Sequence, residues 1–259
     1  MTELEYTFTN DTVFKILFVQ YQDLLKRLVA KMLNIELESI EEFMITNPDI
    51  QSDIIGEKFC RLDINMKVDS RKVDLEVQVN NEGDYPERSL YYWAREYSSS
   101  LSAGGEYYDL PRTIVISIVA FKLFDCMEFH SEYQALEVTR GTQLTDRFCL
   151  HYYELPKLPD DVSSEDELKL WLKLFKAKTE EDLAKIEAMG VTVMKQAIGA
   201  YRAVTATDEF KEIERLRSRA RHNEASALGH ARREERKKWQ SVIAEKDAVI
   251  AQLRAQLEK

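Results

Sequence analysis

The chain has 259 residues, of which 44% are apolar, 10% aromatic and 32% charged. This composition excludes wholesale disorder and indicates one folded domain with an additional segment, or two small domains. Eight glycines and five prolines are few for this length, which disfavours many-turned all-β folds and glycine-rich dinucleotide-binding folds. The net charge of −10 argues against a protein that holds nucleic acid by bulk charge, so only a local basic surface could bind it.

The cysteines and the N-terminal residues indicate the compartment. Three cysteines form no C-x-x-C pair, so a disulfide framework and a structural zinc site are poorly supported and a reducing cytoplasm fits best. The four histidines show no ligand spacing, and none pairs with a cysteine for nucleophilic catalysis. The first residues lack the regions of a signal peptide, and no run approaches the roughly 20 apolar residues of a membrane span. We expect a soluble, cytoplasmic protein.

The first third of the chain predicts a helix followed by two strands. Asn10 or Asp11 can cap a helix that ends at Asn34, because its apolar residues recur at intervals of three and four. Two strands are predicted at 59–68 and 72–79, where apolar and polar residues alternate.

The middle of the chain continues the mixed α/β pattern. A helix is predicted over 85–101, and the β-branched run 112–121 is suited to a buried strand. Two further strands are predicted at 128–138 and 147–155. Residues 163–186 then read as one helix, with Ser163 or Ser164 as its cap.

The C-terminal part differs in composition from the rest. Residues 205–259 carry 13 basic and 10 acidic residues, a net charge of +3, whereas the first 204 residues carry −13. This tail predicts a charged helix, and a heptad seam with one intruding lysine runs through Trp239, Ile243, Lys246, Ile250, Leu253 and Leu257. We expect either a short coiled coil that supports a homo-oligomer or a solvated helix. The expected parts are a core at 1–160, a helical extension at 161–204 and the tail at 205–259.

The strand pair carries the candidate chemistry. If the two strands form a hairpin, a two-residue loop that pairs Val68 with Arg71 gives the same register as a four-residue loop that pairs Lys67 with Lys72. Either loop places Asp63 opposite Glu76, with Gln78 two residues further along the same face. Facing carboxylates repel unless a cation lies between them, and a divalent metal is the natural occupant. By spacing alone, however, a water-facing charged sheet is the favoured interpretation.

Four ordered blocks of sequence add a resemblance to this pattern. The blocks are TNDTVFKILF at 9–18, LDINMKV at 62–68, VDLEVQV at 73–79 and ERSLYYWAREYSSSL at 87–101. Together they resemble the family of recombination-promoting nucleases and transposases, a branch of the PD-(D/E)xK nuclease superfamily. The resemblance implies a restriction-endonuclease-like α/β core, a central mixed sheet flanked by helices.

The resemblance also implies roles for residues of the strand pair. Asp63 matches the metal-binding aspartate and Glu76 the acid of the E-x-K element, while Gln78 occupies the place of the lysine. Asp63, Glu76 and the backbone carbonyl of Val77 would hold Mg²⁺, with Mn²⁺ as a substitute, and Gln78 would orient the attacking water. Asp11 would add an acidic group to the metal site or serve only as a helix cap.

Further residues are candidates for contact with nucleic acid. Lys15 could touch phosphate or simply be exposed, and Lys67 and Lys72 could replace the missing cation or face solvent. Arg88, Tyr92 and Arg95 share one helix face and are candidates for backbone contacts, whereas Tyr91 and Trp93 are expected to pack against the sheet.

The sequence thus predicts a Mg²⁺-dependent DNA endonuclease that acts in recombination or transposition-like processes. The alternative is a catalytically inactive nuclease-fold module that binds partners and assembles through its helical tail, which Gln78 and the overall acidity favour. Nothing in the sequence decides between DNA and RNA as the substrate.

Overall fold

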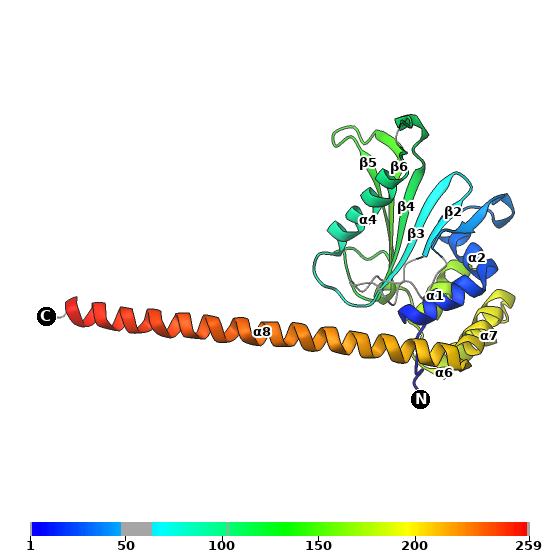
Figure 1. Cartoon of the computed structure of the whole chain (residues 1–259). Coiled ribbons are helices and arrows are strands. Elements are labelled where there is room, and N and C mark those ends of the chain that lie inside the picture. Colours follow the sequence, from blue (N-terminus) through cyan, green and yellow to red (C-terminus); the bar gives the residue numbers. More distant parts are fainter. Residues whose placement is uncertain (1, 48–63, 103, 258–259) are drawn as a thin grey trace. The chain divides into compact units, whose positions relative to one another are not determined.

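The computed structural model describes residues 2–47, 64–102 and 104–257. It contains two compact units, Met1–Phe210 and Lys211–Lys259. The first unit is built on a mixed six-stranded sheet with flanking helices, and about 52% of the chain is helical (Figure 1). This architecture confirms the predicted α/β core. No described helix is both long enough and apolar enough to cross a lipid bilayer.

The sheet has a parallel centre and antiparallel edges. Its strand order is β1-β2-β3-β4-β6-β5, in which β3, β4 and β6 run parallel to one another. The strands are β1 Phe43–Ile45, β2 Ile64–Val68, β3 Arg71–Gln78, β4 Arg112–Val119, β5 His130–Leu136 and β6 Gln143–Glu154. Strand β4 is buried along nearly its whole length, as its β-branched sequence predicts for a strand that is covered on both faces.

The hairpin of β2 and β3 has the predicted register. Val68 pairs with Arg71 and Ile64 with Leu75, so a two-residue loop joins the strands. Asp69 begins this loop with a φ of 52°, a left-handed conformation that a short polar side chain tolerates. Its carboxylate also accepts hydrogen bonds from two backbone N–H groups before β1, at 3.0 Å each. These hydrogen bonds therefore connect the hairpin turn to the segment that leads into the edge strand β1.

The N-terminal helix is broken in two, so the prediction of one continuous helix is wrong. Helix α1 spans Asp11–Gln20 and α2 spans Gln22–Met32, with Tyr21 in a non-helical conformation between them. Asn10 is the cap of α1, and its side chain accepts hydrogen bonds from two backbone N–H groups. Helix α1 is buried on all sides over its middle turns, whereas α2 buries a single stripe. Because the helix is interrupted at Tyr21, α1 can be buried on all sides while α2 buries only one stripe.

Helix α4, Tyr85–Ser99, packs on one face of the sheet. Trp93 donates its indole N–H to the Thr113 carbonyl of β4 at 2.9 Å, which confirms its predicted packing. Tyr85 joins a buried cluster with Val115, Val119, Leu150 and Tyr152. By contrast, 63% of Tyr91 is exposed, so its predicted packing against the sheet is wrong.

The other face of the sheet contacts the end of α2, and the helices that follow the sheet pack on α1 and α2. Helices α5, α6 and α7 span Glu167–Lys176, Glu180–Ala188 and Thr192–Ala206. Tyr153 of β6 donates its hydroxyl to the Met32 carbonyl at the end of α2. The rings of Phe14, Phe18, Trp171 and Phe175 contact one another and join α1 to α5.

Residues 163–186 form two helices, so the prediction of one helix with a serine cap is wrong. Asp166 caps α5 by accepting from the Lys169 N–H at 3.1 Å. The second helix, α6, begins at a capping box in which Thr179 and Asp182 each accept from the other's backbone N–H. The described residues of the first unit also form three short 3₁₀ helices, η1 Leu37–Ser39, η2 Tyr107–Asp109 and η3 Leu155–Lys157.

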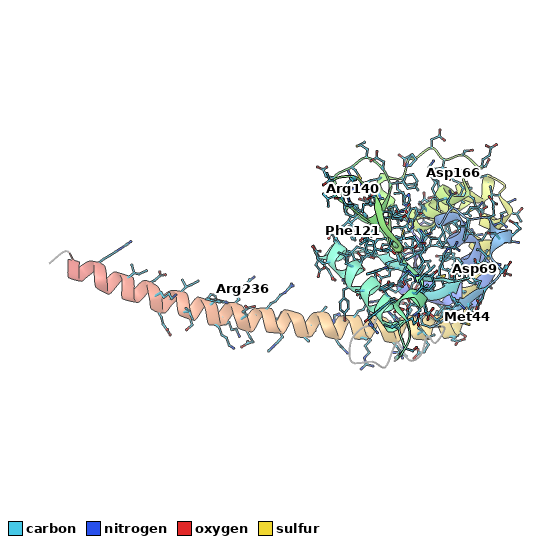
Figure 2. All side chains as sticks on the ribbon, turned by 90° about the horizontal axis from the view of Figure 1, so that it is seen from above. Met44, Asp69, Phe121, Arg140, Asp166 and Arg236 are labelled. Atoms are coloured by element: carbon cyan, nitrogen blue, oxygen red, sulfur yellow. The ribbon has the colours of Figure 1, made fainter. Side chains whose placement is uncertain are left out.

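Helix α8, Asp208–Leu257, makes up nearly all of the second unit. The predicted helical tail is therefore confirmed as a helix. Its charged side chains, among them Arg236, project from the ribbon in Figure 2. Trp239, Ile243 and Ile250 of the predicted seam are 60%, 55% and 47% exposed.

Candidate functional site

The candidate site lies on the polar face of the β2–β3 hairpin. Asp63 falls in the range 48–63, outside the described residues, so its pairing with Glu76 stays a prediction. The register from which that pairing was derived is confirmed for Ile64 to Val68. In the adjacent parallel strand, Glu76 pairs with Ser117, so the two side chains point to the same face of the sheet.

This polar face is buried where β3 carries its acids. Asp74, Glu76 and Gln78 are 3%, 4% and 6% exposed, so the interpretation of a water-facing charged sheet is wrong for these residues. Helix α4 and the parallel strand β4 cover this end of β3. The alternation of apolar and polar residues alone does not indicate this burial. Burial of carboxylates is costly unless hydrogen bonds or cations compensate the lost hydration.

Tyr85 holds the Glu76 carboxylate in place. Its hydroxyl donates to Glu76 Oε2 at 3.0 Å, and both side chains are buried. Burial, together with the charges of Glu76 and Asp74, raises the pKa of Tyr85 well above its ordinary value. The hydroxyl is therefore protonated at neutral pH and acts as a permanent donor. The sequence pattern gives no sign of the role of Tyr85, because its contact with Glu76 requires α4 to fold back over β3.

Gln78 ends β3 in the position where the E-x-K element has lysine. Its Nε2 donates to the Asn80 carbonyl at 2.7 Å. An amide carries two N–H groups and a carbonyl oxygen, so Gln78 offers further hydrogen-bonding capacity to a water molecule but no charge. Val77 lies between the two polar residues with its side chain on the opposite, apolar face.

The three α4 candidates differ in their surroundings. Arg88 lies 5.0 Å above the Tyr85 ring and pairs with Glu82 at 2.8 Å. Its side chain is only 17% exposed, and Nε and Nη2 have no hydrogen-bond partner among the described residues. Tyr92 is half-buried and Arg95 is exposed. Arg88 thus contacts Tyr85, the hydrogen-bond donor of Glu76.

Lys67 and Lys72 lie at the turn end of the hairpin. They pair with each other in register and form ion pairs with Glu42 at 2.9 Å and Glu96 at 3.9 Å. Lys72 and Glu76 are four positions apart, a distance of about 13 Å along a strand. Both lysines are thus too far from Glu76 to replace the missing lysine.

Two candidates on α1 have structural contacts. Asp11 is the first residue of the helix and not its cap, and its predicted role at a metal site stays a prediction. Lys15 is fully buried and donates to the Asn47 carbonyl at 2.6 Å, so the interpretation that it is exposed is wrong. The Asn47 side chain in turn accepts from the Asn65 N–H of β2 at 2.8 Å.

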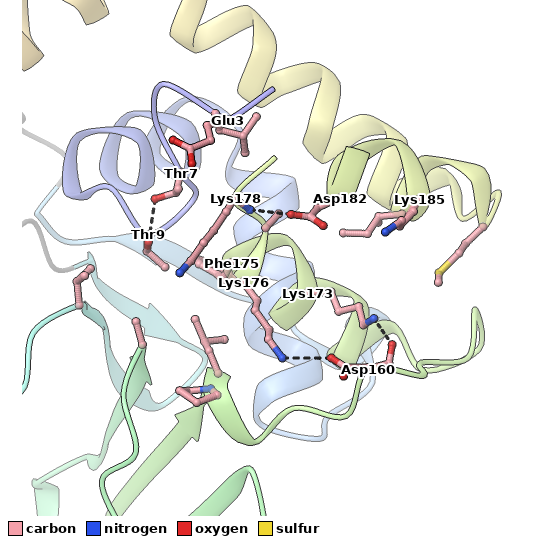
Figure 3. Close-up of a pocket in the computed structure, with 18 residues that line it drawn as sticks. Glu3, Thr7, Thr9, Asp160, Lys173, Phe175, Lys176, Lys178, Asp182 and Lys185 are labelled. Atoms are coloured by element: carbon pink, nitrogen blue, oxygen red, sulfur yellow. Dashed lines mark hydrogen bonds and ion pairs between the residues drawn. The ribbon is translucent and has the colours of Figure 1, made fainter. Parts of the chain in front are cut away.

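A cavity of about 1040 Å³ opens next to the end of β3 (Figure 3). Its lining includes Val79, Ala120 and Leu155, which follow the three parallel strands. Four lysines and three acids also line it, namely Lys173, Lys176, Lys178, Lys185, Glu3, Asp160 and Asp182. In open α/β sheets, ligands bind at the carboxyl ends of parallel strands, and this cavity occupies that position.

The histidines form a second cluster that spacing did not reveal. His151 Nε2 lies 3.2 Å from the Cys149 sulfur, a contact that the spacing of the histidines does not predict. His130 reaches His151 across the β5–β6 pair, with 3.0 Å between His130 Nε2 and His151 Nδ1. Only the antiparallel register of these strands brings the two rings together.

Comparison with known proteins identifies one family. The model of the PD-(D/E)XK nuclease family transposases matches residues 8–231 of the chain. No curated protein and no solved structure matches the chain significantly. The matched range includes the whole sheet, α4 and the start of α8.

Proposed function

Because the chain belongs to the family of PD-(D/E)XK nuclease transposases, we propose that it is a Mg²⁺-dependent DNA endonuclease acting in recombination or transposition-like processes. The observation that carries the proposal is the buried Glu76 carboxylate, which Tyr85 orients on the hairpin face expected to hold Asp63. A carboxylate buried and oriented in this way is suited to a fixed ligand role.

The donor set fits a hard divalent cation. Glu76 and Asp74 place carboxylate oxygens on one buried face, and oxygen ligands are those that Mg²⁺ prefers. Asp63, Glu76 and the backbone carbonyl of Val77 would hold the ion, with Mn²⁺ as a substitute and Asp11 as a further candidate. When bound, Mg²⁺ lowers the pKa of an attacking water and neutralises charge on the phosphate oxygens. Tyr85 fixes the orientation of the Glu76 carboxylate.

In this proposal, Gln78 and Arg88 share the roles that the lysine has in the E-x-K element. Gln78 orients the attacking water through its amide, since it ends β3 beside Glu76 and is itself buried. Arg88 supplies positive charge, because its guanidinium lies over Tyr85 and two of its nitrogens, Nε and Nη2, have no hydrogen-bond partner among the described residues. A guanidinium suits a phosphate oxygen better than most other donors do.

The cavity beside β3 offers a path for the nucleic-acid backbone. Its four lysines can neutralise phosphates next to the site, although the chain as a whole is acidic. Tyr92, Arg95 and Lys15 are the remaining candidates for backbone contacts. Arg95 is exposed and can therefore reach the nucleic-acid backbone. Lys15 is buried and would reach it only after its hydrogen bond to the Asn47 carbonyl opens.

Plasmid nicking with Mg²⁺ tests the proposal. Glu76→Gln and Asp63→Asn keep the side-chain shapes but remove the charges, and each is expected to lower the rate by at least about two orders of magnitude. Glu42→Gln, a change of an exposed acid near the hairpin turn, is the matched control and should retain activity. Equal nicking by the wild type and Glu76→Gln would reject Glu76 as a ligand of the catalytic metal, and absence of nicking by the wild type would reject the endonuclease. An RNA substrate of the same sequence decides between the two nucleic acids.

The second candidate function is an inactive assembly module, which the exposed seam of α8 favours. Trp239, Ile243 and Ile250 recur at heptad spacing and are about half exposed. We propose that this seam pairs with the same helix of a second copy. Ile243→Asp with Ile250→Asp should convert an oligomer into a monomer in light-scattering measurements, whereas Gln240→Asp should not. An unchanged mass would exclude the seam as the interface.

A further inference from the structure

Outside the nuclease site, one group of side chains has the composition of a metal site. Among the described residues, Glu132, Cys149 and His151 each offer one ligand atom, and these three atoms lie within 4.8 Å of one another. Cys149 and His151 are two residues apart on β6, so their side chains share a face, and Glu132 of β5 lies directly opposite His151. All three residues come from the regular ladder before the β5 register shifts.

The distances between the donor atoms suit a tetrahedral ion. Tetrahedral zinc, with Zn–S of about 2.3 Å and Zn–N of about 2.0–2.1 Å, separates sulfur from a nitrogen or oxygen ligand by about 3.6 Å. The Cys149 sulfur lies 3.2 Å from His151 Nε2 and 3.6 Å from Glu132 Oε1. Small side-chain adjustments are thus enough to place an ion between them.

His130 completes the arrangement by orienting His151. Its Nε2 lies 3.0 Å from His151 Nδ1, and the two rings are parallel to within 6°. His130 also stacks on Tyr153 with ring centroids 4.4 Å apart, which fixes the plane of its ring. When His151 Nδ1–H donates to His130, the lone pair of His151 Nε2 is directed towards Cys149. Metal-binding histidines in proteins almost always have such a partner on the second ring nitrogen.

We propose that Glu132, Cys149 and His151 bind one Zn²⁺ ion, with His130 as a positioning residue and water as the fourth ligand. A thiolate, an imidazole and a carboxylate together favour zinc over Mg²⁺, which prefers oxygen alone. The thiolate and the carboxylate balance the charge of the ion. Glu132 is exposed, so the ion can enter from the sheet edge while Cys149 and His151 stay buried.

The zinc site is separate from the nuclease site. His151 pairs in register with Ile116 of β4, and Ile116 pairs with Leu75 of β3. Leu75 and Glu76 point to opposite faces because neighbours along a strand alternate. The ion would therefore fasten the edge strand β5 to β6 on the face away from Glu76, and the proposal does not depend on the nuclease activity.

Zinc binding by the full chain tests the proposal. After removal of metals with a chelator, calorimetric titration should show one Zn²⁺ per chain, and Cys149→Ser should weaken it at least 100-fold. Cys126→Ser is the matched control, because Cys126 is exposed and lies outside the cluster. Glu76→Ala should bind zinc like the wild type, which separates this ion from one at the nuclease site.

Two further measurements keep the test decisive. Co²⁺ added to the wild-type chain should give the near-ultraviolet band of a thiolate–cobalt bond, a result that does not depend on the folding of any variant. His130→Leu should weaken zinc binding roughly 10–100-fold, and His130→Gln, which retains an acceptor oxygen, should restore part of the loss. Absence of the cobalt band, or undiminished zinc binding by a folded Cys149→Ser variant, would leave only a buried hydrogen-bonded cluster and overturn the proposal.

Discussion

Replacing Tyr85 by phenylalanine removes a single oxygen atom from the candidate site. The lost hydroxyl donates to Glu76 Oε2 at 3.0 Å. The ring itself stays, together with its edge contacts to Phe121 and Tyr152, each with 6.3 Å between ring centroids, and the Arg88 guanidinium at 5.0 Å. The change therefore isolates the hydrogen bond from the packing of α4 on the sheet.

The magnitude follows from the kind of bond that is lost. A hydrogen bond to a buried charged group contributes about 1.5–3 kcal/mol. If Tyr85 holds Glu76 in the geometry that binds the metal, this loss lowers the nicking rate by about 10- to 100-fold at limiting Mg²⁺. The free energy of unfolding should fall by no more than about 1–3 kcal/mol, because the cost is that of one buried acceptor left without its donor.

The assay is plasmid nicking over a range of Mg²⁺ concentrations, with urea denaturation of the same samples. Tyr85→Phe should require more Mg²⁺ for half-maximal rate than the wild type. Tyr97→Phe is the control, since Tyr97 lies on the same helix and stacks on Trp93, away from Glu76. A Tyr85→Phe variant that folds and nicks with the wild-type rate and Mg²⁺ dependence would refute the idea that Tyr85 orients Glu76.

Three predictions concern stability, each measured by chemical denaturation. Thr179→Ala removes the cap of α6 and should cost about 1 kcal/mol, and no loss would contradict the capping box. Phe14→Ala empties a fully buried site beside Phe18 and should cost about 3–5 kcal/mol. Burial, and then the charge of Glu180, raises the pKa of Tyr201 from 10.0 to about 12. A raised pKa means that the folded protein favours the neutral hydroxyl. The contribution of this hydroxyl to the free energy of unfolding is complete below pH 10 and is lost as the pH rises towards 12. Tyr201→Phe should therefore lessen the fall in the free energy of unfolding at alkaline pH.

The hairpin register was predictable because its constraint is local. Alternating apolar and polar residues in both strands permit only pairings that keep the faces matched, and a slip by one residue would invert a whole strand. The breaks at Tyr21 and after Lys176 were missed because neither has a glycine or proline. The second break carried a signal nonetheless, since Thr179 and Asp182 have the spacing of a capping box.

The surroundings of the candidate site were less predictable than its residues. The spacing of Glu76 and Gln78, together with the resemblance of four sequence blocks to the nuclease family, predicts both as site residues, but their burial depends on α4 folding back over β3. In the same way, His130 and His151 are separated by 21 residues, and only the β5–β6 register brings their rings within 3.0 Å. A pattern in one segment cannot report contacts that two packed elements create together.

The two edge strands of the sheet bear on how the chain avoids unwanted association. Strand β1 has only three residues, and β5 combines exposed polar side chains with two register shifts. Short, polar or irregular edges offer a poor template for a strand of another molecule. The parallel centre, which is rich in β-branched residues and prone to aggregation when unfolded, is thereby shielded from edge-to-edge growth in the folded protein. A substitution that disrupts either edge strand is expected to lower the solubility of the protein before it lowers the stability of the fold.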